Sequence, residues 1–134
     1  MKLSVFTAST PWLALPELIP AVAEAGYTGI EIGFKDRVYD PGKPPQFWNN
    51  NPAILDYGKA EDEAHAARAA IDAARLDCCA LGTYANLRDV ERFPTCFAVA
   101  KILDAEIMRV WPGAYESGRS YADQLAERRA VYRD

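Results

Sequence analysis

Two kinds of apolar pattern alternate along the chain, and this alternation most constrains how it can fold. Short β-rich runs are each followed by a segment with helical spacing, and the pair repeats four times. Such an order favours a parallel sheet whose strands are joined by right-handed helical crossovers. The sequence therefore predicts an α/β fold, with strands at residues 3–8, 27–33, 76–84 and 106–111 and helices at about 16–25, 61–75, 89–100 and 120–133.

The third predicted helix contains a proline that interrupts its pattern. Val90, Phe93, Phe97 and Ala100 have the spacing of one helical face and are expected to form its inner stripe. Pro94 lies inside this stripe and predicts either a kink or a short helix followed by a second start.

Residues 34–60 break the rhythm and are expected to form a long proline-rich loop. Four prolines, three consecutive asparagines and the aromatic pair Phe47 and Trp48 lie in this stretch. Proline fixes φ and removes a backbone donor, so regular structure is not expected here. The aromatic side chains favour an ordered, partly packed loop over a flexible linker, and a loop this long inside a domain is typical of a functional segment.

Length and charge exclude several classes of protein. The 134 residues are expected to form a single domain, residues 1–134, and the net charge of −4 does not fit a nucleic-acid partner. No apolar run approaches the ~20 residues needed to span a bilayer, so no membrane partner is expected. Met1, Lys2 and Leu3 lead directly into the first strand, which leaves no room for a signal peptide and favours a cytoplasmic protein.

The cysteines and the single histidine are expected to be structural. Cys78 and Cys79 are adjacent in a predicted strand, so their side chains point to opposite faces and are poorly placed to bind one ion together. Together with Cys96 they are expected to be buried as small hydrophobic side chains. His65 is predicted to lie on a helix surface away from the strand ends, which disfavours His-dependent nucleophilic catalysis.

Four strand motifs together resemble one superfamily. They are residues 2–7 (KLSVFT), 25–33 (AGYTGIEIG), 79–84 (CALGTY) and 107–113 (IMRVWPG). In this order, with helices between them, they resemble the xylose-isomerase-like TIM-barrel superfamily, and in particular its sugar phosphate isomerase/epimerase branch. The resemblance implies a (βα)4 half of a (β/α)8 barrel. Arg75 and Asp104 depart from the pattern, because relatives commonly end these helices with glycine, so these helix ends are expected to close differently.

The resemblance also implies which groups this chain lacks. Complete family members are expected to hold a divalent metal (Mn, Mg, Zn or Co), whose ligands come from strands five to eight of the barrel. No matching positions are present, so no metal ligand and no cofactor is assigned to this chain. A full barrel takes about 250 residues, and the two outer strands of a half-barrel each leave an open edge. Closure by a homodimer, an open sheet and a truncated product are the three solutions considered.

Function in a parallel β/α protein is expected at the carboxyl ends of the strands. Glu31 is the one acidic residue next to a predicted strand end, and it could bind a sugar hydroxyl, join a metal shell or be a structural acid. Arg109 is expected to pair with it inside the sheet. The candidate substrate-binding residues are Glu31, Phe34, Thr83, Tyr84 and Trp111, while no catalytic residue is assigned.

Two functions remain open from the sequence. The first is the N-terminal half of a metal-dependent sugar (phosphate) isomerase or epimerase, with a small sugar or polyol as ligand. The second is a non-catalytic half-barrel that binds a small polyol or only itself.

Overall fold

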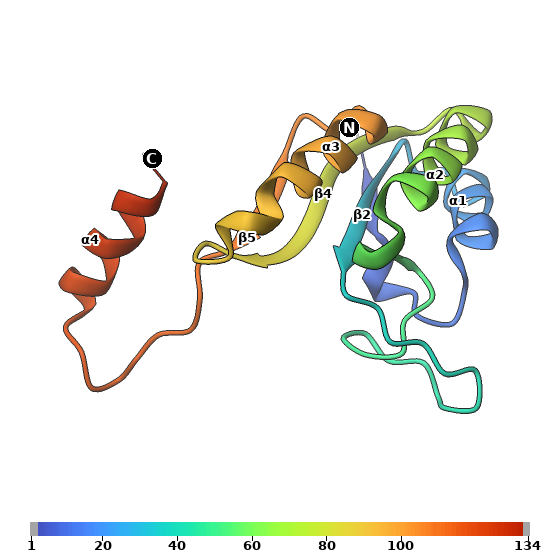
Figure 1. Ribbon diagram of the computed structural model, residues 1–134. Helices are drawn as coiled ribbons and strands as arrows, with labels where there is room; N and C mark the ends of the chain where they lie inside the picture. The colour runs from blue at the N-terminus through green and yellow to red at the C-terminus, as the bar shows by residue number, and fades with distance from the viewer. Residues whose placement is uncertain (1–2, 133–134) are drawn as a thin grey trace.

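The computed structural model describes residues 3–132, which form one five-stranded parallel sheet with helices (Figure 1). The strands follow the order β1-β2-β4-β5, and β3 pairs with β2. Parallel neighbours require a crossover between them. Helices supply these crossovers except between β2 and β3, which are joined by the irregular residues 36–53. The strands are β1 (Ser4–Phe6), β2 (Gly29–Lys35), β3 (Ile54–Asp56), β4 (Asp77–Asn86) and β5 (Met108–Trp111).

The first three long helices cover one face of the sheet, whereas the last helix stands apart from it (Figure 1). Short 3-10 turns precede α2 and α3 and follow β1. The helices are α1 (Leu15–Glu24), α2 (Ala60–Ala74), α3 (Phe93–Leu103) and α4 (Tyr121–Val131), and the 3-10 turns are η1 (Thr7–Ser9), η2 (Tyr57–Lys59) and η3 (Val90–Arg92). The predicted α/β class with a parallel sheet is therefore confirmed.

The core lies between the sheet and α1, α2 and α3. Ile30, Ile32 and Phe34 alternate along β2 and are each at most 1% exposed. Alternation by two places all three on the face that the helices cover. The helices contribute buried side chains such as Ile19 and Ile71 to the same cluster.

The prediction of one unbroken loop over residues 34–60 is wrong at both ends. β2 continues to Lys35, and β3 forms a parallel ladder with it, pairing Gly33 with Ile54 and Lys35 with Asp56. β4 pairs with one side of β2. On the other side, β1 pairs with the first part of β2, up to Glu31, and β3 pairs with the last part, from Gly33. Three residues are too few for a clear period of two, and the nearby Pro52 concealed this strand in the sequence.

The inner stripe predicted for the third helix is wrong at Val90 and Phe97, whereas Ala100 is buried and Phe93 packs against the core. Val90 and Phe97 are 61% and 60% exposed, and the buried positions of α3 are Cys96, Val99, Ala100 and Leu103. The reason is the helix start: Val90 belongs to η3, and α3 begins only at Phe93. Pro94 therefore lies in the first turn of α3, which confirms the predicted second start.

Two helices end on left-handed residues that are not glycine. Arg75 after α2 has φ 57°, and Asp104 after α3 has φ 55°. The Leu76 N–H donates to Ile71 O and the Arg75 N–H to Asp72 O, the usual closure of a helix end with a left-handed residue. The expectation that these ends close differently is wrong, because the backbone keeps the usual geometry without the glycine.

The cysteines and the histidine lie largely where the sequence predicted. Cys78 and Cys96 are buried, whereas Cys79 is partly exposed and His65 lies on the surface of α2. Burial raises the pKa of the Cys78 thiol from 9.0 to about 11. No helix between residues 3 and 132 is long and apolar enough to cross a membrane. Lys2 and Arg133, which belong to a predicted strand motif and helix, lie outside the described residues.

Candidate functional site

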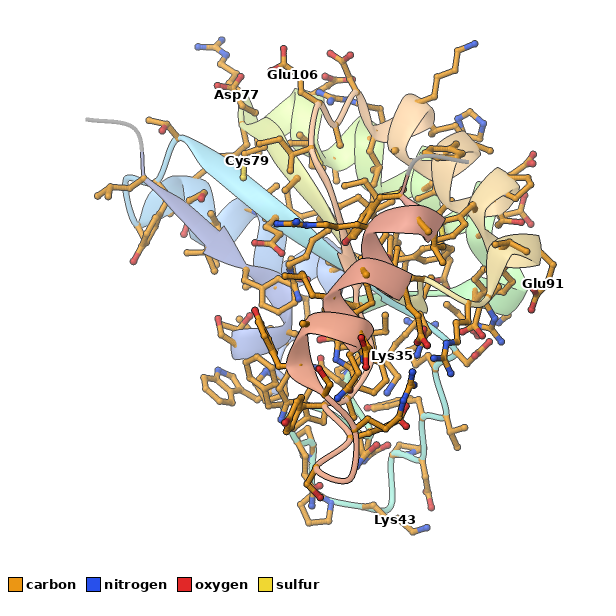
Figure 2. All side chains as sticks on the ribbon, turned by 90° about the vertical axis from the view of Figure 1, so that its left-hand side faces the viewer. Lys35, Lys43, Asp77, Cys79, Glu91 and Glu106 are labelled. Atoms are coloured by element: carbon orange, nitrogen blue, oxygen red, sulfur yellow. The ribbon has the colours of Figure 1, made fainter. Side chains whose placement is uncertain are left out.

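The sheet face opposite the helices, which we call the inner face, carries the charged side chains of the strands. Alternation along β2 directs Glu31 and Lys35 away from the helix-covered side chains Ile30, Ile32 and Phe34. Lys35 lies toward the carboxyl ends of the strands, whereas Asp77 and Glu106 lie at the opposite end of the sheet (Figure 2). The inner face is therefore polar where the core face is apolar.

An ion pair between β2 and β5 is the centre of this face. The Arg109 Nη2 and Nε atoms donate to Glu31 Oε1 over 2.9 Å and 3.2 Å. The side chains of Arg109 and Glu31 are 50% and 25% exposed. The guanidinium also lies 5.0 Å from the centroid of the Phe6 ring, a cation–π contact. The predicted pairing of Arg109 with Glu31 is confirmed.

Gly82 leaves the space that this ion pair occupies. A Cβ atom at Gly82 would lie 2.8 Å from both Arg109 Nη2 and Glu31 Oε1, and 3.0 Å from Phe6 Cε2. Because β4 lies between β2 and β5, the ion pair has to cross this strand. A side chain at position 82 would occupy the space through which Arg109 reaches Glu31.

Tyr84 brings a phenol to the same cluster. Burial raises its pKa above the usual value and Glu31 adds to this, while the charge of Arg109 and a hydrogen bond to it oppose the rise. Lys35 Nζ lies 5.4 Å from the centroid of the Tyr84 ring. One carboxylate, two cations and a neutral phenol therefore meet on the inner face.

The proline-rich segment, residues 36–53, supplies an aromatic wall next to these groups. The Trp48 ring packs edge-on against Tyr84, with 5.7 Å between centroids, and Phe47 lies 6.0 Å from Phe6. Lys35 Nζ donates to the Trp48 carbonyl over 2.9 Å. The prediction of an ordered, partly packed segment is confirmed for this part of the chain.

Asn51 fixes this segment to the end of β1. Its side chain is 1% exposed, and its Nδ2 donates to Ala8 O and to Phe47 O, both over 3.0 Å. Its Oδ1 accepts from the Ala53 N–H at 2.8 Å. All three bonds are buried or partly buried, so Asn51 determines where Phe47 and Trp48 lie.

The predicted binding residues divide between the two faces of the sheet. Glu31, Tyr84 and Trp111 lie on the inner face, where Trp111 is 51% exposed two residues beyond Arg109 on the same strand. Phe34 and Thr83 are 1% and 2% exposed and point toward the helices, where Phe34 stacks on Tyr57. The Thr83 hydroxyl donates to Arg109 O over 2.7 Å, so it links β4 to β5 beside the Glu31–Arg109 pair.

Sequence reasoning missed Phe6, Lys35 and Trp48 as members of this cluster. Lys35 could have been found, since it follows Glu31 by four residues on one strand and must share its face. Phe6 pairs in register with Glu31. Trp48 carried no such signal, because its position depends on the path of an irregular segment.

Two cavities set limits on where a ligand can bind. A cavity of about 370 Å³ lies between the end of β2 and the proline-rich segment, lined among others by Lys35, Trp48 and Asn49. Another cavity, about 570 Å³, is mainly apolar and lies between α1 and α2, with the Arg37–Glu63 ion pair at its rim. It is on the helical side and away from the strand ends, so we assign the candidate site to the inner face.

Residues 3–132 contain no group of three or more His, Cys, Asp or Glu side chains placed to hold a metal ion. The carboxylate of Glu31 is already engaged by Arg109. No protein-family model matches this sequence, and no curated protein matches it.

Proposed function

We propose that this chain is the polyol-binding half of a (βα)8 barrel of the xylose-isomerase-like kind, acting in a sugar isomerase or epimerase. The observation that carries the proposal is the Glu31–Arg109 ion pair with Tyr84 beside it on the inner face. The pair lies partway along β2 and β5, on a sheet whose other face is closed by helices. Lys35 and Tyr84 extend the cluster toward the carboxyl ends of the strands, where β/α-barrel enzymes bind substrate.

The cluster has the groups that bind a polyol. A carboxylate accepts hydrogen bonds from two neighbouring hydroxyls, and a guanidinium donates two in a fixed plane. Glu31 and Arg109 hold one another in place before a ligand arrives, which lowers the cost of ordering them. Trp48 and Trp111, 58% and 51% exposed, offer aromatic faces for the apolar C–H side of a sugar.

The metal expected of complete family members does not fit the residues described. No three ligating side chains converge between residues 3 and 132, and the Glu31 carboxylate is bound by Arg109. We therefore derive no reaction step through a metal ion for this chain.

A non-catalytic polyol-binding half-barrel is the second candidate. The ion pair itself favours it, because Arg109 Nε and Nη2 both bond the same oxygen of Glu31. A carboxylate oxygen that already accepts two hydrogen bonds has less room to accept a proton from a substrate. Under this proposal the inner face binds the polyol but does not move a proton.

Solvent exchange at a substrate carbon separates the two candidates. The chain is incubated with D-fructose or D-xylose in D2O, with and without added Mn²⁺, and proton NMR follows the hydrogen next to the carbonyl. Deuterium uptake that depends on the chain and is lost in Glu31→Gln supports the enzyme. The matched control is Glu61→Gln, an exposed carboxylate on α2. Ligand binding without exchange supports the non-catalytic candidate, and neither binding nor exchange contradicts both.

A further inference from the structure

The sheet ends in two strands that each pair on one side only. Among the described strands, β1 bonds only to β2 and β5 only to β4. On β5 the carbonyls of Ile107 and Trp111 accept bonds from the backbone N–H groups of Leu81 and Leu87, over 2.8 Å and 3.1 Å. Backbone direction alternates along a strand, so the groups of Met108 and Val110 point away from β4. They form an open row that another strand can extend.

Large apolar side chains are exposed beside these two edges. Leu3, just before β1, is 48% exposed, Ile107, just before β5, is 61% exposed, and Trp111, the last residue of β5, is 51% exposed. Single exposed apolar side chains are ordinary, but a group of them marks an interaction surface. Here the group follows the open backbone edges.

Helix α4 carries a third uncovered apolar surface. Tyr121, Leu125 and Tyr132 recur at the spacing of one helical face, and both tyrosines are more than 60% exposed. The one buried side chain of α4 is Gln124, and its Nε2 donates to Glu116 O and Arg119 O within the preceding segment.

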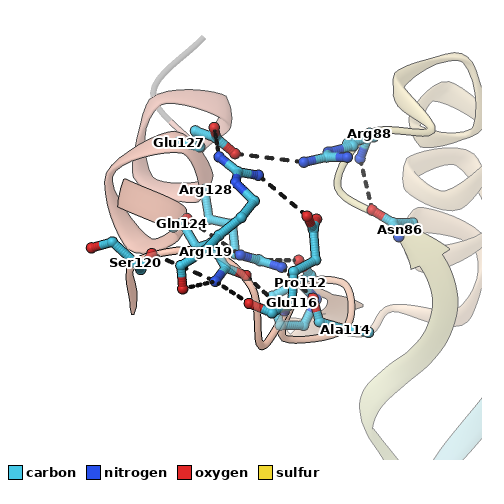
Figure 3. Close-up of polar contacts among 10 residues, drawn as sticks. All are labelled: Asn86, Arg88, Pro112, Ala114, Glu116, Arg119, Ser120, Gln124, Glu127 and Arg128. Atoms are coloured by element: carbon cyan, nitrogen blue, oxygen red, sulfur yellow. Dashed lines mark hydrogen bonds and ion pairs between the residues drawn. The ribbon is translucent and has the colours of Figure 1, made fainter. Parts of the chain in front are cut away.

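Polar contacts hold α4 in place relative to that segment. Arg128 Nε donates to Pro112 O over 2.6 Å and its Nη2 to Ala114 O over 2.7 Å (Figure 3). Arg88, in the turn after β4, lies 3.6 Å from Glu127. These contacts hold α4 away from the sheet (Figure 1). The two tyrosines of its stripe stay largely exposed, although the Tyr121 ring lies 6.5 Å from that of Tyr115 in the preceding segment.

We infer that a second copy of this chain closes the barrel, with β1 of each copy paired to β5 of the other and α4 covering the seam. A two-fold axis along the strands leaves every strand parallel and pairs the outer edges of β1 and β5 in both copies. The short strand β3, which pairs only with β2, takes no part in this closure. The inference rests on the proposed function in one respect, namely that the inner face is a binding site. Arg109 on the outer strand β5 is half exposed, and the inner face becomes an enclosed site only with the second copy.

The exposed aromatic side chains supply a substantial part of the area that such an interface buries. Aromatic side chains bury roughly 150–250 Å² each. With exposures of 51% to 66%, Trp111, Tyr121 and Tyr132 of two copies would contribute roughly 450–1,000 Å² together. The strand edges and aliphatic side chains add to this, which brings the total toward the ~1,200–2,000 Å² of stable interfaces.

Sedimentation equilibrium of the full chain over a wide range of concentrations tests the inference. The expected mass is twice the 14.8 kDa of one chain. Val110→Pro removes an N–H that points to the open edge and should give a monomer, whereas Val110→Ala keeps the N–H and should remain dimeric. Circular dichroism checks that both variants are folded.

A second pair of variants tests the role of α4 without changing the sheet. Leu125→Glu puts a charge into the apolar stripe and should weaken the dimer at least tenfold. Ala130→Glu places the same charge on the opposite side of α4 and should leave the dimer unchanged. A monomeric wild-type chain or a filament would overturn the inference, and a Leu125→Glu dimer of unchanged affinity would remove α4 from it.

Ligand binding by the same samples keeps the two proposals apart. A dimer that binds no polyol contradicts the proposed function and leaves the interface standing. A monomer that binds a polyol at the inner face does the reverse.

Discussion

The Arg109 guanidinium reaches across Gly82 to the Glu31 carboxylate, with 2.9 Å between Nη2 and Oε1. The pair joins β5 to β2. The backbones of these two strands are not hydrogen-bonded to each other, because β4 lies between them. The absence of a side chain at Gly82 is what makes this contact possible. Three strands thus combine to position one charged group pair on the inner face.

Gly82→Ala should displace this ion pair. The new Cβ would meet Arg109 Nη2 and Glu31 Oε1 at 2.8 Å, so both side-chain ends have to move. We expect the free energy of unfolding to fall by about 1 kcal/mol, at the low end for overpacking because flexible side-chain ends can yield. Urea unfolding measures it. Gly118→Ala is the matched control, since a Cβ there meets nothing within 4 Å; an equal effect at both positions would contradict the account.

The ion pair itself should contribute little to stability. Half of the Arg109 side chain is exposed, and exposed pairs are worth roughly 0.2–1 kcal/mol. A double-mutant cycle of Glu31→Gln and Arg109→Ala, read by urea unfolding, should give a coupling energy in that range that declines at high salt. No coupling at low salt would show that the two side chains do not pair in solution.

Asn51→Ala should loosen the proline-rich segment. It removes the side-chain partners of Ala8 O, Phe47 O and the Ala53 N–H, which are otherwise withdrawn from water. Leaving such groups unpaired costs roughly 1–3 kcal/mol. We expect lower stability and faster proteolysis within residues 36–53, followed by mass spectrometry. Asn49→Ala, at an exposed position, should change neither quantity.

Stability should decline in alkaline solution because of Cys78. Burial raises the pKa of its thiol from 9.0 to about 11. Between these values the unfolded chain loses the proton while the folded chain keeps it, so unfolding becomes easier as pH rises. Below pH 9 the thiol is protonated in both states and has no effect. Urea unfolding from pH 8 to 11 should show this decline, and Cys78→Ala should reduce it; an unchanged slope would contradict the burial of Cys78.

The alternation of strands and helices was readable from the sequence because it depends on local periodicity. β3 was not, since its three residues are too few to show a period and pair with β2 only in the folded chain. The stripe of α3 was misread because the helix start was predicted at about residue 89. The helix in fact begins at Phe93, one residue before Pro94.

The site was only partly readable for a related reason. Proximity to a strand end suggested Phe34 and Thr83, but the face of the strand decides which side chains meet, and both point to the helices. Lys35 satisfies both conditions and shares its strand face with Glu31. Trp48 reaches the inner face through the path that Asn51 fixes, which no local pattern encodes.

The most direct test of the account is a titration of the ¹⁵N-labelled chain with xylitol and with myo-inositol, followed by amide chemical shifts. A polyol site on the inner face predicts saturable shifts at Glu31, Tyr84 and Arg109 that Arg109→Ala abolishes. Saturable shifts confined to the cavity between α1 and α2, at Ala66 and Ala70, or no saturable shifts at all, would contradict it.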